Sequence, residues 1–290
     1  MRRLKQITWT TRWVRRVSRF KAGQRLLRSF QTLPVTGAIY RAAVGYNRPF
    51  ASLEEAHRAV LPYANMGHEH PLTAAEHLKF KKHNRTSDYA ALFHITNILP
   101  EVNEVFDLGG CVGNLFYAYS EDIEGLSRVT WRVLDLPTHV EQGEALAKER
   151  GVPQLKFTQD WLDAGRADLL IVSGALHYLE TPLPKMLGEL RRKPAYLLIN
   201  RTPLTEGVAV AAIQDKTDYR VACMLYNRSE LIRDLQQLGY VVVDEWRAPE
   251  LSMEIPGYPE HKIWAYSGIF LRYEGKEEKL QGEYSPSRHS

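Results

Sequence analysis

One short segment carries most of the residues whose types and spacing suggest ligand chemistry. It runs from Val105 to Asn114 as Val-Phe-Asp-Leu-Gly-Gly-Cys-Val-Gly-Asn, so an apolar run reaches an acid, then glycines, and a second apolar series follows. This order predicts a buried strand, a tight turn and the first turn of a helix. Glycines in such a turn let backbone amides and a helix N-terminus approach a ligand closely.

Further polar residues follow later apolar runs. Asp135 comes 22 residues after Gly113, Asp160 follows the next short run, and Ser173 precedes Gly174. In a doubly wound sheet, ligands bind beyond the carboxyl ends of the strands, where the strand order reverses. A carboxylate there can accept hydrogen bonds from both hydroxyls of a ribose, so the pattern favours an adenosine cofactor.

The spacing of the glycines separates three adenosine cofactors. The NAD fingerprint needs glycines at its first, third and sixth positions, and aligning its last glycine with Gly113 places Leu108 at the first. An ATP-binding loop needs Gly-Lys-Ser or Gly-Lys-Thr, which does not follow the turn. S-adenosylmethionine (SAM) carries an ammonium and a sulfonium, which an acid such as Asp107 would attract. The turn therefore favours SAM.

The elements that must position these residues follow from the alternation of apolar runs with helical patterns after residue 100. Alternation of this kind predicts a parallel sheet with helices on both faces and right-handed crossovers. The expected strands cover residues 102–108, 129–134, 155–158, 167–172, 196–199, 240–246 and 262–273. The expected helices cover residues 114–120, 138–150, 182–192 and 228–238. Because a long loop joins the last two strands, we expect them to pair antiparallel at an edge.

Upstream of residue 101, helical patterns cover residues 53–61, 73–83 and 87–99. The predicted fold class is therefore α/β: a Rossmann-like, doubly wound, mostly parallel seven-stranded sheet with an antiparallel edge strand, plus an N-terminal helical cap. We divide the chain into a basic amphipathic arm and linker (1–50), the helical cap (51–100), the sheet domain (101–274) and a polar tail (275–290).

Charge is distributed very unevenly. Residues 1–53 hold 12 Lys or Arg and no Asp or Glu, which leaves 26 basic and 34 acidic residues in the rest of the chain. A nucleic-acid enzyme usually carries its basic surface on the folded body, so no nucleic-acid partner is expected. The two cysteines give no disulfide framework, and the apolar runs are too short to span a membrane. These features indicate a protein of a reducing compartment, expected to be cytoplasmic.

Residues 1–30 alternate apolar and basic side chains at helical spacing, for example Trp13, Val17 and Phe20 among arginines. Basic amphipathic helices lie on anionic membrane surfaces. Three interpretations stay open: contact with the inner membrane face, a helix that packs its apolar stripe on the body, and a targeting presequence.

The motifs together carry a resemblance. Asp107-Leu-Gly-Gly-Cys-Val-Gly113 resembles the first motif of class I SAM-dependent methyltransferases, and Asp135-Leu-Pro is similar to the ribose-binding segment of small-molecule O-methyltransferases. Gln159-Asp-Trp161 and Ser173-Gly-Ala-Leu-His-Tyr-Leu179 resemble the adenine-binding and strand-4 segments of the same superfamily. The match covers about residues 101–274. The chain is most similar to a group of bacterial methyltransferases associated with surface-polysaccharide synthesis.

The resemblance implies roles for the cofactor-binding residues. Gly109, Gly110 and Gly113 would let the backbone approach SAM, and Asp107 would lie beneath its amino-acid end. The remaining positions would be Asp135 on the ribose, Leu136 near the adenine, Asp160 on the adenine amino group, Trp161 stacked on the ring, and Ser173 in the segment beside the methyl group. Asp135 as a helix cap, Asp160 as a turn acid and Trp161 as a core residue are the open structural alternatives.

His177 is the catalytic candidate. Transfer of a methyl group to a hydroxyl needs alignment of donor and acceptor and removal of a proton, and the pKa of a histidine suits a general base. In plant-type O-methyltransferases a histidine in the resembling segment is the base, followed by Asp-Trp, whereas Tyr178-Leu-Glu180 follows here. A pocket wall and a structural histidine are the alternatives.

The acceptor is the least determined part. Arg201, Tyr178, Tyr219 and His261 are candidate substrate contacts, and Arg201 would meet an anionic group or loop carbonyls. The histidines around His68-Glu-His70 match no zinc pattern, so no metal site is expected.

The expected function is methyl transfer from SAM to an oxygen of a small molecule or of a lipid-linked glycan. Two alternatives remain: a methyltransferase with a protein or other acceptor, and a SAM-binding partner protein without catalysis. The oligomeric state does not follow from the sequence.

Overall fold

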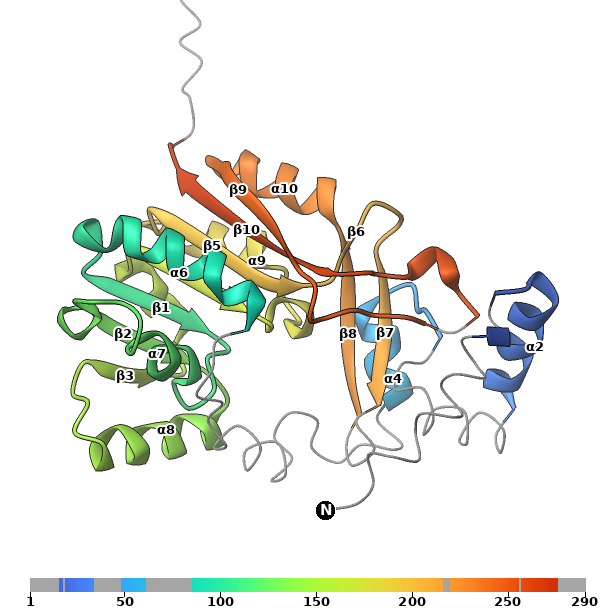
Figure 1. The fold of residues 1–290 in the computed structure, drawn as a ribbon, viewed down its shortest axis with the longest axis horizontal. Coiled ribbons are helices and arrows are strands. Elements are labelled where there is room, and N and C mark those ends of the chain that lie inside the picture. Colours follow the sequence, from blue (N-terminus) through green and yellow to red (C-terminus); the bar gives the residue numbers. More distant parts are fainter. Residues whose placement is uncertain are drawn as a thin grey trace, which may run out of the picture.

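The computed structural model describes residues 16–17, 19–33, 48–60, 85–215, 220–255 and 257–275. Several predicted features lie outside the described residues: the first 15 residues of the arm, the His68-Glu-His70 loop, the expected helix 73–83, Tyr219 and the tail after residue 275. A large sheet carries most of the fold (Figure 1). Its strands are β1 (Glu104–Leu108), β2 (Thr130–Leu134), β3 (Leu155–Thr158), β4 (Leu169–Ser173), β5 (Tyr196–Thr202), β9 (Tyr240–Ala248) and β10 (Tyr266–Tyr273).

The order of the strands in this sheet is β3-β2-β1-β4-β5-β10-β9. The first five pair in parallel, and β10 pairs antiparallel with both β5 and β9. The order reverses between β1 and β4, so the crevice expected for a ligand lies beyond their carboxyl ends. The seven-stranded, mostly parallel sheet with its antiparallel edge pair confirms the predicted fold class.

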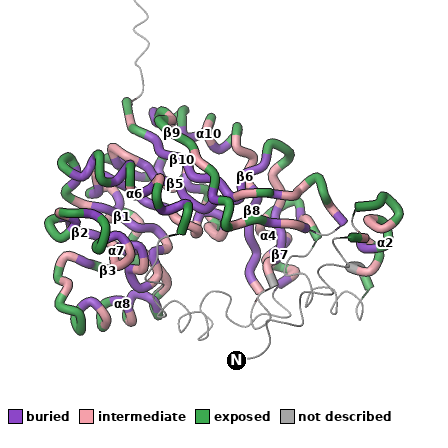
Figure 2. Tube along the Cα trace, in the orientation of Figure 1, coloured by how far each residue is buried: buried purple, intermediate pink, exposed green. Residues whose placement is uncertain are grey.

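Helices cover both faces of the large sheet because its strands are apolar on both sides. Leu169 and Ile171 of β4 pack in the cluster that includes α6 and α7, whereas Leu170 and Val172 pack in the cluster that includes α9 and α10. The labelled strands β1, β5 and β10 are mostly buried, whereas most residues of the edge strand β9 are exposed or half-buried (Figure 2). The helices are α2 (Lys21–Thr32), α4 (Leu53–Val60), α6 (Thr86–Ile98), α7 (Asn114–Tyr119), α8 (Pro137–Glu149), α9 (Leu183–Glu189) and α10 (Arg228–Gln237), with short 3₁₀ turns η2 (Leu99–Glu101), η3 (Leu126–Arg128), η4 (Trp161–Arg166), η5 (Leu176–Tyr178) and η6 (Pro259–His261).

A second, three-stranded sheet follows β5 and was not predicted from the sequence. Its order is β6-β8-β7, from β6 (Leu204–Thr205), β7 (Val210–Asp215) and β8 (Arg220–Asn227). One face packs on α4 and Phe50, which forms a bridge with Ala211. The other face packs on the loop between β9 and β10, including Met253 and Ile263. That loop also explains why β10 begins at Tyr266 rather than at residue 262.

The predicted cap helices separate in space. Helix α4 begins with Ser52 accepting from the Glu55 amide, as its capping sequence predicts, and packs on the small sheet. Helix α6 packs instead on the large sheet through residues such as Ile95. No described helix is both long and apolar enough to cross a bilayer.

The described part of the arm forms α2, which lies at the end of the molecule away from β1 (Figure 1). Leu27 is buried, and Arg28 donates to the carbonyl of Gly257 at 2.8 Å and lies over the ring of Tyr258. Arg28 also pairs with Glu260 at 3.1 Å. One side of α2 is therefore packed on the loop between β9 and β10.

Candidate functional site

The predicted ligand-binding residues follow strands whose carboxyl ends share one edge of the large sheet. Leu108 pairs with Leu134, Leu134 with Thr158, and Ser173 with Asn200. Parallel pairing in this register brings the segments after β1, β2, β3 and β4 to the same edge of the sheet. The edge is also the point where the strand order reverses, as expected for a ligand site.

The glycine turn after β1 packs against its neighbours too closely for larger side chains. Gly109 has a φ of 75°, and a Cβ atom there would collide with the side chain of Ala175 after β4. Cys111 also adopts a left-handed conformation, with a φ of 55°, which is unfavourable for a residue with a Cβ. This conformation accompanies a 2.7 Å hydrogen bond from the Cys111 amide to Oδ2 of Asp135. The first turn and the end of β2 are therefore joined directly.

Asp107 lies beneath this turn and is 1% exposed. Its Oδ2 accepts from Nε1 of Trp131 at 3.1 Å, whereas its Oδ1 has no hydrogen-bond partner among the described residues. Burial raises the pKa of Asp107 to about 7, the Trp131 hydrogen bond opposes the shift, and the charge of Asp135 adds to it. A Cβ at Gly110 would collide with this carboxylate. A buried carboxylate oxygen without a donor can accept a hydrogen bond from a cationic group of a ligand.

Asp135 is held by donors from its own chain. Besides the Cys111 amide on Oδ2, Oδ1 accepts from the amide of Leu136 at 2.7 Å and faces Nδ1 of His139 at 2.6 Å. The side chains of Asp135 and His139 are 8% and 3% exposed. His139 was not among the site residues predicted from the sequence. The spacing could have indicated this contact, because Asp135 and His139 are four residues apart and side chains at this spacing meet on one side of a helix.

Cys111, Asp135 and His139 each place one potential metal-ligand atom within 4.8 Å of the other two. Burial, together with the carboxylates of Asp135 and Asp107, raises the pKa of the Cys111 thiol well above its ordinary value. A metal needs the thiolate, so these surroundings disfavour metal binding, and Asp135 already accepts from backbone amides.

The segment expected at the adenine shows two local roles. Asp160 is exposed, and its Oδ1 accepts from the amide of Leu162 at 2.9 Å, so it begins the turn η4. Trp161 is half-buried, donates from Nε1 to the carbonyl of Met186 at 3.0 Å, and packs edge-on against Phe106. Asp160 is thus a turn acid and Trp161 packs within the fold, as the two structural alternatives describe.

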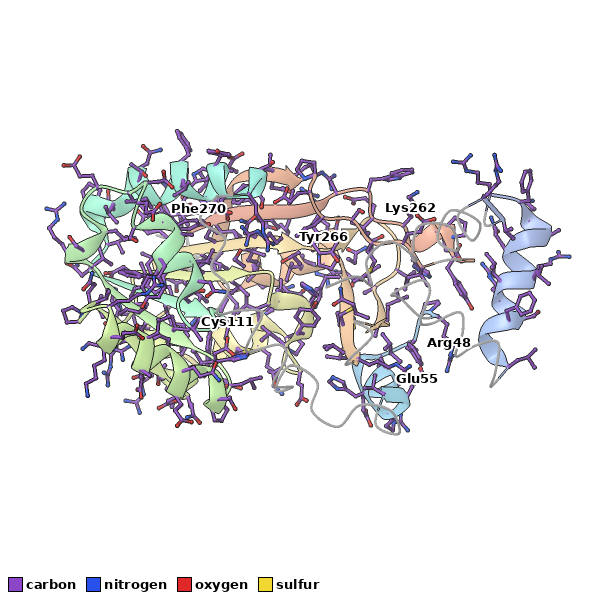
Figure 3. All side chains as sticks on the ribbon, turned by 60° about the horizontal axis from the view of Figure 1, so that its bottom comes forward. Arg48, Glu55, Cys111, Lys262, Tyr266 and Phe270 are labelled. Carbon is purple, nitrogen blue, oxygen red and sulfur yellow. The ribbon has the colours of Figure 1, made fainter. Side chains whose placement is uncertain are left out.

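The segment after β4 lies where the two sheets meet. Ser173 has a buried Oγ with no partner among the described residues. His177 is 4% exposed, with its ring 4.0 Å from that of Tyr178 and edge-on to Tyr266, which Figure 3 labels between the sheets. The Tyr178 hydroxyl donates to Gln214 of the small sheet at 2.7 Å. The small sheet therefore packs directly beside the catalytic candidate.

Arg201 has a left-handed conformation, with a φ of 54°, and is 9% exposed. Its guanidinium pairs with Asp88 and donates to Oγ of Ser87 at 3.1 Å, and the Tyr119 hydroxyl donates to Asp88 at 2.8 Å. Arg201 thus ties β5 to the start of α6. Ser87 bonds in turn to Glu250.

His261 lies apart from these groups. It belongs to η6, beside α2, at the end of the molecule away from the labelled Cys111 (Figures 1 and 3). The structure therefore brings together the glycine turn, Asp107 and Asp135, places Ser173 and His177 at the same sheet edge, and leaves His261 distant.

Comparisons with known proteins give structural matches only. No protein-family profile matches the chain, and no curated protein matches its sequence. Among solved structures, 1,6-didemethyltoxoflavin-N1-methyltransferase of Burkholderia thailandensis, with bound 1,6-didemethyltoxoflavin and S-adenosylhomocysteine, has a TM-score of 0.50 at 16% identity, covering 78% of this chain and 92% of that one. This likeness supports the Rossmann-like fold.

Two further structures match more loosely. The N-terminal domain of EvdMO1, in the presence of S-adenosylhomocysteine and D-fucose, has a TM-score of 0.44 at 15% identity, covering 70% of this chain and 94% of that one. Mitomycin 7-O-methyltransferase MmcR has a TM-score of 0.44 at 14% identity, covering 88% of this chain and 73% of that one.

Proposed function

We propose that this protein is a SAM-dependent methyltransferase that transfers the methyl group to an oxygen of a small molecule or glycan. The observation that carries the proposal is the buried Asp107 carboxylate under the glycine turn, with one oxygen lacking a partner among the described residues. The ammonium of the methionine part of SAM is a donor of the right charge for that oxygen. The structural likeness to a methyltransferase with bound S-adenosylhomocysteine (SAH) supports the same cofactor.

The residues at the sheet edge fit an adenosine with an amino-acid end. Gly109 and Gly110 let the turn pack closely on Ala175 and Asp107, because a Cβ at either position would collide with one of these side chains. Asp135 is oriented by its own chain, as a ribose-binding acid must be. Leu136, Asp160 and Trp161 follow the neighbouring strand ends and would form the adenine side.

SAM, when bound, supplies an electrophilic methyl group on a sulfonium. The chain must then align the acceptor, exclude water and take a proton from a hydroxyl. His177 is buried beside Tyr178 and Tyr266, which exclude water from its ring. We assign His177 as the general base, and Ser173, whose buried Oγ has no partner among the described residues, as a polar contact for the ligand at the end of β4.

The acceptor side is formed where the two sheets meet. Tyr178 is held by Gln214 of the small sheet, and Arg201 is held by Asp88 at the start of α6. Because the ion pair with Asp88 already neutralises Arg201, we propose that Arg201 shapes this side rather than binding an anion alone. The resemblance to methyltransferases of polysaccharide synthesis supports a glycan acceptor.

The function is tested by turnover. The protein is incubated with SAM labelled on its methyl group and with hydroxylated acceptors, including sugar nucleotides and polyprenyl-linked sugars, and SAH release is measured. Acceptor-dependent release of SAH together with a labelled O-methyl product supports the proposal. Binding of SAM without release of SAH with any acceptor contradicts catalysis and favours a SAM-binding partner protein.

We further propose that α2 places the protein on the inner membrane face, where lipid-linked glycans occur. Leu26 and Leu33 are 47% and 54% exposed, and Arg19, Lys21 and Arg25 are exposed beside them. Residues 1–53 hold no acid at all. Exposed apolar residues among cations are the features that hold a helix on anionic lipid.

Flotation with liposomes tests the membrane contact. The full chain should float with vesicles of acidic lipid, and Leu26→Ser with Leu33→Ser should reduce flotation several-fold because each change removes buried apolar area. Val208→Ser with Val243→Ser is the matched control, since both valines are exposed elsewhere. Equal flotation of the full chain and a chain lacking residues 1–30 would overturn the proposal.

A further inference from the structure

His139 is the strongest unexplained polar group near the site. It lies in the first turns of α8, is 3% exposed, and directs Nδ1 at Oδ1 of Asp135 from 2.6 Å. A carboxylate can only accept, so the Nδ1 atom carries the proton in this contact. The contact joins the start of α8 to the end of β2.

The other donors to Asp135 show what this contact does. The Leu136 amide shares Oδ1 with His139, while the Cys111 amide takes one position on Oδ2. A carboxylate has about four acceptor positions. Among the described residues three are filled, and the one that remains is on Oδ2, the oxygen that faces the glycine turn. The His139 contact therefore fixes the rotation that determines where this last position points.

We infer that His139 is a positioning residue that orients Asp135 to accept from a single hydroxyl of the donor's ribose. The inference rests on the proposed function, and it refines that function, because the sequence alone suggested that Asp135 accepts from both hydroxyls. Without the Nδ1 donor, only the two backbone amides hold the carboxylate. With two hydrogen bonds instead of three, the rotation of the carboxylate is restrained less, so its remaining acceptor position on Oδ2 is aimed less strictly.

Two substitutions separate the hydrogen bond from the volume. Asparagine can place its amide nitrogen near the position of Nδ1, so His139→Asn keeps a donor to Oδ1. His139→Leu fills similar space with no donor, and His139→Gln, whose amide reaches beyond that position, serves as a second variant should the leucine variant fail to fold. The unfolding midpoint of each ligand-free variant is measured first to show that it folds.

Binding is measured by calorimetry with SAH and with its 2′-deoxy and 3′-deoxy analogues. We expect His139→Leu to weaken SAH binding by about tenfold, the effect of one hydrogen bond to a charged group. We expect His139→Asn to recover most of that loss. One of the two deoxy analogues lacks the hydroxyl that donates to Asp135, and it should bind the wild-type protein more weakly than SAH does. The affinity for this analogue should fall by less than about twofold in His139→Leu, because the hydrogen bond that His139 supports is already absent.

Each outcome is distinct. Equal weakening of SAH and both analogues in His139→Leu would show a general structural role and overturn the inference. Unchanged SAH binding in His139→Leu would also overturn it while leaving the proposed function standing. Absence of SAH binding to the wild-type protein would overturn the proposed function, and with it this inference.

Discussion

The region around the glycine turn and the region around the small sheet are built in opposite ways. In the first, buried polar groups meet over short stretches of chain: Trp131 bonds to Asp107, and Asp135 to Cys111, each across 24 residues. In the second, apolar surfaces from distant segments pack together, as where Phe50 pairs with Ala211. Hydrogen bonds orient groups more strictly than apolar packing does. Under the proposed function, the first region would bind the invariant cofactor and the second would form an acceptor side that can vary.

The largest expected effect tests whether His177, at the junction of the two regions, takes part in methyl transfer but not in cofactor binding. His177→Asn should lower turnover about 10²- to 10⁴-fold, the contribution of a general base, while the dissociation constant of SAH changes by less than about twofold. Turnover is followed by methyl release from labelled SAM. Asp234→Ala, on the surface of α10 and away from the proposed site, is the control and should keep full turnover. Full turnover in His177→Asn would show that the histidine is a wall of the pocket.

The next effect tests whether the first region alone binds the cofactor. Asp135→Ala should weaken SAH binding about a hundredfold, because it removes the ribose acceptor and releases the Cys111 amide. Calorimetry measures the change, with Asp234→Ala on the surface of α10 as the control. Unchanged affinity in Asp135→Ala would place the ribose elsewhere.

A third change tests the close packing of the turn. Gly110→Ala places a Cβ against the Asp107 carboxylate and should lower the free energy of unfolding by about 1–3 kcal/mol, the usual cost of overpacking. Chemical denaturation provides the measurement. Gly188→Ala in α9 meets nothing within 4 Å and should be neutral or stabilising. Equal stability of the two variants would mean that the turn is looser than described.

The smallest effect concerns the charge of Asp107. With a pKa of about 7 in the ligand-free protein, Asp107 must lose its proton before it can pair with an ammonium. The affinity for SAH should therefore fall about tenfold from pH 8 to pH 6, with proton release on binding at the lower pH. Calorimetry in buffers of different ionisation enthalpy measures both. Asp107→Asn should bind more weakly and lose this pH dependence; a persistent dependence would assign it to another group.

The same titration affects stability in the opposite direction. Folding raises the pKa of Asp107 from 3.8, so the ligand-free protein holds this proton more tightly than the unfolded chain does. Its contribution to stability is present at low pH and is lost as the pH rises from about 4 to about 7.

The fold of the large sheet could be predicted because its elements are encoded locally. The apolar run before Asp107, the glycine turn and the acid after the next run specify strand, turn and strand end within 30 residues. Asn227 directly precedes the predicted helix 228–238, and its side chain caps α10 by accepting from the Glu230 amide. The alternation of strands and helices then predicts a mostly parallel sheet covered by helices, whereas the order β3-β2-β1-β4-β5-β10-β9 comes from the structure.

The small sheet could not be predicted in the same way. Its strands β7 and β8 are short apolar runs without a tight-turn signal, and they are stable only because α4 and the loop after β9 cover their faces. The role of Arg201 in tying β5 to α6 depends on Asp88, 113 residues earlier. Such contacts leave no pattern in the local sequence.

Calorimetry with SAH, SAM and NAD⁺ tests the central claim most directly, that the turn after β1 binds the adenosine and amino-acid parts of a methyl donor. We expect saturable one-to-one binding of SAH and SAM, no binding of NAD⁺, and binding of SAH and SAM that is about a hundredfold weaker in Asp135→Ala. A correctly folded protein, with a cooperative unfolding transition, that binds neither SAH nor SAM would contradict the account.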